Sequence, residues 1–234
     1  MVRQTQDLID INSITSLNDV MNTLERLNDQ LNDLQLAQYL LFNKAYLVVT
    51  RNMQQAIYDK RFNNPAFIKK FITRFAARYF KAINSSAGKD TGLPLPWQKL
   101  TDYAALSSAP VFISLMLGAN AHINYDLPQV LDKLMPEDKP DNLLGDLSQM
   151  DKLLMESGKE IIGLFEEKNA LLDFLKRRFQ FMYYRPAMYT VLYWRIRAWR
   201  GYKALGKDPA AMARITERSV KTANRLLAIG RILG

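Results

Sequence analysis

The chain has 234 residues, of which 48% are hydrophobic, 24% are charged and none is cysteine, and its formal net charge is +9. This length and composition allow a substantial core, but the absence of cysteine excludes disulfides and thiolate metal sites. With only one histidine, the chain cannot assemble the sets of two or three imidazoles that usually bind zinc, whereas a carboxylate site for Mg²⁺ or Ca²⁺ is not excluded.

Apolar residues recur at helical spacing along almost the whole chain, and no segment sustains the alternation that is typical of a strand. The pattern predicts an all-α protein, a single helical domain of about seven or eight helices with two long packed helices. We expect residues 1–34 to form an N-terminal helical extension and residues 35–234 to form the helical domain itself.

In the first half of the chain, local signals predict three helices. Ser16 and Asp19 form a capping pattern that predicts the start of the first helix. A second helix is predicted for residues 35–60, and the third begins at Asn64-Pro65 and extends to about Asn84. The segment Ser85–Pro96 is rich in Gly, Ser and Pro and predicts a loop.

Five further helices are predicted in the second half of the chain: residues 109–122, 127–135, 146–183, 186–205 and 208–232. Residues 136–142 are predicted to be a turn-rich linker before the long helix 146–183. Pro186 is expected to break the long helix 146–183, Gly206 to end the next helix, and Asp208 to cap the last one.

The most apolar window, Ala104–Ala121, contains three serines and a proline, which makes it too polar for a confident membrane span. We therefore interpret it as a buried helix. The first residues lack the basic and apolar regions of a signal peptide, so we expect a cytoplasmic protein with no membrane span.

The single histidine, His122, follows this apolar run and lies among Asn120, Asn124 and Asp126. On a helix it shares its side with small and apolar residues. Three roles are open: a buried neutral imidazole bonded to a backbone carbonyl, a general base or hydrogen-bonding group for a ligand, or a metal ligand.

Asp126 lies four residues after His122, so on a continuous helix its carboxylate would lie beside the imidazole. However, Asp126-Leu-Pro-Gln129 is also a helix-capping pattern, with proline just inside the helix and glutamine at its third position. Of the two interpretations we favour the cap, and a capping aspartate could still orient the imidazole.

Arg195 falls in the middle of an apolar helical stripe that includes Leu192 and Trp199. A buried guanidinium keeps its charge and therefore needs a carboxylate or an anionic ligand. Residues 126–173 contain twelve acids and five lysines, so one hypothesis is a structural ion pair between Arg195 and one of these acids. The other hypothesis is that Arg195 binds an anion in a pocket.

Residues 174–207 combine nine lysines and arginines with ten aromatic residues and no acid. Such interleaving can mark a single-stranded nucleic-acid surface. Here the aromatic residues recur at the spacing of a helical core and no nucleic-acid motif accompanies them, so we do not predict nucleic-acid binding.

Several segments together resemble a domain family of unknown function, DUF5995. They are Tyr46-Leu-Val-Val-Thr50, Phe75-Ala-Ala-Arg-Tyr79, Leu95-Pro96-Trp97, the segment Gly118–Leu127 that matches Gly-x-Asn-Ala-His-Ile-Asn-x-Asp-Leu, and Arg195–Trp199. The resemblance covers about residues 42–205, and Ala119 replaces the methionine expected in the family. It implies helices, no established activity, and a shared feature that contains Asn120, His122, Asn124, Asp126, Arg195 and Trp199.

We therefore hypothesise a small-molecule pocket at His122. Its candidate catalytic residues are His122 and Asp126, and its candidate binding residues are Trp97, Asn120, Asn124, Arg195 and Trp199. In this hypothesis His122 acts as an acid–base group on a partly apolar ligand whose carboxylate or phosphate Arg195 holds. The alternative is a non-catalytic interaction protein in which the His122 and Arg195 contacts form a structural network. The residues indicate no metal and no particular cofactor, and they leave the oligomeric state open.

Overall fold

The computed structural model describes residues 8–88, 92–106, 109–135, 141–164 and 185–233, and these residues form helices and no strand. The prediction of an all-α fold is therefore confirmed. The α-helices are α1 Leu17–Gln30, α2 Leu40–Tyr58, α3 Pro65–Ala87, α4 Leu95–Tyr103, α5 Val111–Asn120, α6 Leu127–Leu134, α7 Asp141–Gly163, α9 Arg185–Leu205 and α10 Ala211–Leu233. A π-helical segment, Ala121–Asp126, joins α5 to α6.

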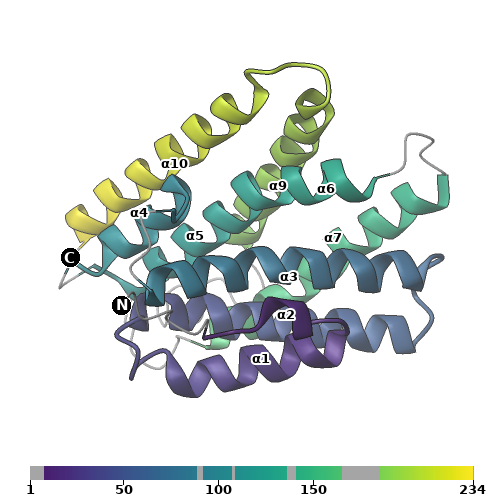
Figure 1. The fold of residues 1–234 in the computed structure, drawn as a ribbon, viewed down its shortest axis with the longest axis horizontal. Helices are drawn as coiled ribbons and strands as arrows, with labels where there is room; N and C mark the ends of the chain where they lie inside the picture. The colour runs from purple at the N-terminus through teal and green to yellow at the C-terminus, as the bar shows by residue number, and fades with distance from the viewer. Residues whose placement is uncertain (1–7, 89–91, 107–108, 136–140, 165–184, 234) are drawn as a thin grey trace, which may run out of the picture.

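The helix that runs through α5, the π segment and α6 lies at the centre of the fold. On one side it packs against α2 and α3, with α1 beyond them, and on the other it packs against α9 and α10 (Figure 1). Helix α7 packs against both α2 and α9. The segment that carries His122 is thus surrounded by helices from both halves of the chain.

Both predicted helix caps in the first half of the chain are confirmed. The Asp19 amide donates to Ser16 Oγ at 3.2 Å, and the Ser16 amide donates to Asp19 Oδ2 at 2.8 Å. At the start of α3, the Phe67 amide donates to Asn64 Oδ1 at 3.0 Å, and Pro65 occupies the first helical turn. Near the C-terminus, the Ala210 amide donates to Asp208 Oδ1 at 2.8 Å, just before α10.

Helix α1 shares the core of the helices that follow it. Val20, Leu24 and Leu27 are fully buried in that core. The Asn43 side chain on α2 donates a hydrogen bond to the Leu24 carbonyl at 2.7 Å, which satisfies a buried amide between the two helices.

Two predicted loops are shorter than expected. Helix α4 begins at Leu95, within the predicted loop, because Pro94 and Pro96 are compatible with a helix start. Helix α7 begins at Asp141, within the predicted linker, because Leu143 is already buried in the core and continues the helical pattern.

The predicted helix 146–183 is wrong as one uninterrupted element. Helix α7 ends at Gly163 and Leu164 lies in a turn, and glycine is a poor helix former that favours helix ends. Residues 165–184 of the predicted helix lie outside the described residues. The described part of helix α9 is Arg185–Leu205 and contains Pro186, and the helix ends before Gly206 as predicted.

The predicted break between a helix ending at His122 and a second helix capped by Asp126 is also wrong. Asp126 has helical backbone angles, φ −76° and ψ −41°, and its side chain makes no capping bond. The chain stays helical because the Leu127 amide bonds to the His122 carbonyl, a π-type contact to the fifth residue back. Pro128 lacks an amide hydrogen and crowds the fourth residue before it, so the wider π turn accommodates it without ending the helix.

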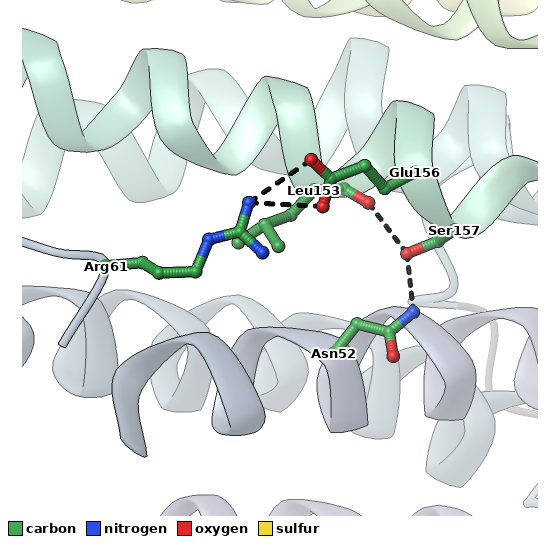
Figure 2. Close-up of polar contacts among 5 residues, drawn as sticks. All are labelled: Asn52, Arg61, Leu153, Glu156 and Ser157. Carbon is green, nitrogen blue, oxygen red and sulfur yellow. Dashed lines mark hydrogen bonds and ion pairs between the residues drawn. The ribbon is translucent and has the colours of Figure 1, made fainter. Parts of the chain in front are cut away.

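Polar contacts fix α7 to α2, as Figure 2 shows. Asn52 Nδ2 donates to Ser157 Oγ at 2.9 Å, and Ser157 Oγ donates to the Leu153 carbonyl at 2.8 Å. Arg61, just after α2, contacts both carboxylate oxygens of Glu156 at 3.2 Å. These contacts set the register of α7 against α2.

The buried carboxylate of Asp146 fixes α7 to the start of α3. It accepts hydrogen bonds from the Asn63 and Asn64 amides, both at 2.7 Å, and from Asn63 Nδ2 at 3.0 Å. A fully buried carboxylate is tolerated when several donors satisfy it, as they do here.

Among the described helices, none combines the length and the hydropathy required to cross a lipid bilayer.

Candidate functional site

The imidazole of His122 packs against several aromatic rings. The Phe75 ring stacks on it with a centroid distance of 3.6 Å and an interplanar angle of 7°. The Tyr46 ring lies at 4.9 Å and the Phe42 ring at 5.7 Å, both nearly edge-on. These contacts leave the buried imidazole, which is 2% exposed, with a fixed orientation.

A buried hydrogen-bond network holds one edge of the imidazole. His122 Nδ1 lies 3.1 Å from Asp126 Oδ2, and Trp97 Nε1 donates to the same oxygen at 3.0 Å. The carboxylate can only accept, so Nδ1 carries the ring proton and Nε2 carries a lone pair. Trp97 and Asp126 therefore fix both the orientation and the tautomer of His122.

Two polar atoms beside this network have no hydrogen-bond partner. They are His122 Nε2 and the Tyr46 hydroxyl, and both are buried. Burial lowers the pKa of His122 against the opposing effect of Asp126, while burial raises the pKa of Tyr46 far above its usual value. At neutral pH the two groups are therefore uncharged, and they offer one hydrogen-bond acceptor and one donor.

Both residues line a cavity of about 120 Å³ between α2, α3, α5, α7 and α9. Of its described lining residues, four carry polar side-chain groups: Tyr46, Thr50, His122 and Arg195. The other lining residues are apolar, among them Val49, Phe71, Leu115, Met116, Met150 and Met188. Thr50 is already bonded, because its hydroxyl donates to the Tyr46 carbonyl at 2.8 Å.

The profile of a family described as a family of unknown function, DUF5995, matches residues 17–231. The chain belongs to the DUF5995 family. The match corrects the expectation that the resemblance covers only about residues 42–205, since it includes α1 and most of α10. Neither a curated protein nor a solved structure matches the chain.

In this DUF5995 protein, Arg195 on α9 is partly buried and forms an ion pair. Its Nε donates to Asp151 Oδ1 on α7, and its side chain is 13% exposed. Asp151 is one of the acids in the segment 126–173, so the structure contains the ion pair that one of the two sequence hypotheses described. Arg195 also lines the cavity, and its role in ligand binding stays a prediction.

The structure places the two asparagines away from the cavity. Asn120 Nδ2 donates to the Ser219 carbonyl on α10 at 3.0 Å, and Asn124 Nδ2 donates to Asn120 Oδ1 at 2.9 Å. Neither residue is among the described residues that line the cavity. This pair connects the central helix to α10.

Trp199 is also not among the described residues that line the cavity. Its ring packs edge-on against Tyr202 with a centroid distance of 5.1 Å, and Lys203 Nζ lies 5.6 Å from its centroid. The structure thus brings together His122, Asp126 and Trp97 and places Arg195 at the same cavity, whereas Asn120, Asn124 and Trp199 are elsewhere. The binding and catalytic roles of all seven residues stay predictions.

Sequence reasoning did not select Tyr46 and Phe75 as site residues. Both lie in the segments on which the family resemblance rests, Tyr46–Thr50 and Phe75–Tyr79, and both contact the imidazole. The signal that could have identified them was their aromatic character within segments shared with the family. Among the described residues, no three His, Asp or Glu side chains come together as a metal site requires.

Removing the Tyr46 hydroxyl is expected to leave stability unchanged or to raise it. Tyr46→Phe removes a buried hydroxyl that has no partner. Tyr79→Phe is the matched control, because the Tyr79 hydroxyl donates to Asn43 Oδ1 at 3.1 Å and its loss leaves that acceptor unpaired. We expect the control to lower the free energy of unfolding by about 1–2 kcal/mol, as measured by urea denaturation. Equal losses of stability in both variants would show that the Tyr46 hydroxyl does have a hydrogen-bond partner.

Stability is expected to fall as the pH decreases below the ordinary histidine pKa of about 6.5. The pKa of folded His122 is lowered, so the unfolded chain binds a proton that the folded chain resists, and acid favours unfolding. The groups around the ring are Asp126, Tyr46 and Arg78, of which Asp126 favours the protonated ring and Arg78 opposes it. The loss is at most about 1.4 kcal/mol per pH unit for one site.

Because His122 is the only histidine, a substitution at this position isolates the contribution of histidine to the pH dependence of stability. Urea denaturation between pH 7.5 and pH 5.5, a range chosen as about one unit on each side of that pKa, should show a shallower decline for His122→Gln than for the wild type. Identical slopes would show that the histidine does not cause the decline.

Proposed function

We propose that this protein binds an apolar small molecule in the cavity between α2, α3, α5, α7 and α9, with a polar group of that molecule at His122. One observation carries the proposal: two buried polar atoms without partners, His122 Nε2 and the Tyr46 hydroxyl, belong to residues that line an apolar cavity.

Energetics support this proposal. Close-packed cores leave few voids, and each buried polar group without a partner costs about 1–3 kcal/mol. A void and two such groups at one place therefore destabilise the protein in its empty form. A ligand that fills the cavity and bonds to both atoms removes both costs.

The size of the cavity limits the ligand. An apolar cavity of about 150 Å³ in another protein binds benzene. The cavity of about 120 Å³ is therefore suited to a group near the size of one benzene ring or a short branched chain.

The network behind His122 also supports a chemical role. With Nδ1 bonded to Asp126, Nε2 carries a lone pair without a partner, and in this proposal that lone pair takes a proton from the bound molecule. Asp126 would then stabilise the imidazolium across 3.1 Å. His122 is thus proposed as the proton acceptor of the site, and Trp97 and Asp126 as the groups that position it.

Toluene is a direct probe of the proposed pocket, because it has one ring and no polar group. We expect calorimetry to detect toluene binding to the wild type and at least about a tenfold weaker affinity in Ala119→Leu, which fills the cavity. Ala66→Leu is the matched control, since Ala66 is exposed in the first turn of α3 and should retain binding.

Native mass spectrometry of freshly purified protein complements this titration. Extra mass that is lost on denaturation and is absent from Ala119→Leu would support the pocket. If toluene does not bind, or binds equally to wild type and Ala119→Leu, the proposal is wrong. The His122 network would then serve the structural role of the alternative hypothesis.

A further inference from the structure

We infer that the polar group recognised in this cavity is an uncharged hydroxyl, which donates a hydrogen bond to His122 Nε2 and accepts one from the Tyr46 hydroxyl. This inference rests on the proposed function and specifies the ligand class. It replaces the anionic ligand that the sequence suggested through Arg195.

The two buried atoms differ in hydrogen-bonding character. Nε2 can only accept, because Asp126 holds the ring proton on Nδ1 at the other side of the imidazole. The Tyr46 hydroxyl has no acceptor of its own, so its hydrogen is available. A single ligand hydroxyl satisfies both, since it has one hydrogen and two lone pairs.

The Tyr46 and His122 rings are neighbours, with a centroid separation of 4.9 Å and an interplanar angle of 62°. Because both residues also line the same cavity, we take one small group to contact both polar atoms. A carbonyl oxygen could accept from Tyr46 but would leave Nε2 unpaired, and a hydrocarbon would leave both atoms unpaired.

The charges around the cavity favour an uncharged group. A carboxylate placed at His122 would meet the Nε2 lone pair, with the buried Asp126 carboxylate directly behind the ring. Arg195 lines the cavity but is already paired with Asp151, and Arg78 is not among the described lining residues. An ammonium group would lose its hydration in an apolar cavity that Arg195 also lines. An uncharged hydroxyl avoids all of these costs.

The experiment compares three ligands that share one ring and one substituent carbon: toluene, benzyl alcohol and benzoate. Calorimetry at pH 7.5 measures the affinity of each for the wild type and for Tyr46→Phe. We expect Tyr46→Phe to lower the affinity for benzyl alcohol about tenfold and to leave the affinity for toluene unchanged or higher. Tyr39→Phe is the matched control, because the Tyr39 hydroxyl is bonded to Ser86 and the residue does not belong to the described cavity lining.

Nuclear magnetic resonance supplies a second, direct measurement. The single histidine gives one Nε2 signal, which benzyl alcohol should shift and toluene should leave in place. Tighter binding of benzoate than of benzyl alcohol, or equal effects of Tyr46→Phe on toluene and benzyl alcohol, would overturn the inference while the pocket itself stands. If none of the three ligands binds, the proposed function fails and the inference fails with it.

Discussion

Replacing Asp126 with alanine is expected to lower the free energy of unfolding by about 3 kcal/mol. The substitution removes the acceptor of two buried donors, Trp97 Nε1 and His122 Nδ1, and each buried donor left without a partner costs about 1–3 kcal/mol. For a chain of this length, the melting temperature should fall by roughly 6–12 °C, which differential scanning calorimetry measures.

Asp126→Asn is the matched control for this prediction. Both donors bond to the same oxygen, Oδ2, so the amide oxygen of asparagine can occupy that position and accept both bonds. Stability should therefore fall by less than about 1 kcal/mol. The loss of charge should lower the pKa of His122 further, because Asp126 is the group that raises it. A loss below about 1 kcal/mol for Asp126→Ala would show that this network does not support the core.

Replacing Gly118 with alanine is expected to lower the free energy of unfolding by about 2–3 kcal/mol. A Cβ atom at this position would lie 2.6 Å from Phe42 Cγ and 2.8 Å from Phe42 Cβ, on the rigid inner part of that side chain. Phe42 cannot move freely, because its ring contacts the rings of Tyr79, Trp97 and His122. The substitution therefore forces α2 and α5 apart.

Gly145→Ala is the control, and its expected effect on the free energy of unfolding has the opposite sign. This glycine lies inside α7, and the nearest atom to an added Cβ is Asn63 Nδ2 at 3.6 Å, an ordinary contact distance. Alanine is the better helix former, so stability should rise by about 0.5–1 kcal/mol. Chemical denaturation of both variants checks the pair, and equal effects on the free energy of unfolding would show that Phe42 does not restrict the side chain at position 118.

The elements that the sequence predicted well are those set by local chemistry. The caps at Ser16 and Asn64 need only neighbouring residues, and both helices begin where these caps place them. The continuous helix through Asp126 was missed, because a capping pattern before Pro128 is also compatible with a π turn. Packing around the segment decides between a helix cap and a π turn, and the local sequence pattern does not encode that packing.

The contacts of the candidate site also fall into those that local sequence predicts and those that depend on tertiary packing. His122 and Asp126 are four residues apart on one helix, so their contact followed from the sequence once the helix was continuous. The contacts from Tyr46, Phe75 and Trp97 come from three other helices, and tertiary packing alone brings them to the imidazole. Arg195 could be predicted to need a negative partner, but its choice of Asp151 depends on how α7 and α9 are aligned.

The π segment also changes the helical phase of the central helix. A bond to the fifth residue back accommodates one more residue than an α-turn does, and each residue of an α-helix turns the chain by about 100°. The side chains of α6 are therefore rotated relative to those of α5 by about one residue step. As a result, a single continuous helix directs one packing face toward α2 and α10 and a differently oriented face toward α9. Deleting one residue from Ala121–Asp126 would restore the α-helical phase and turn one of these faces away from its partner.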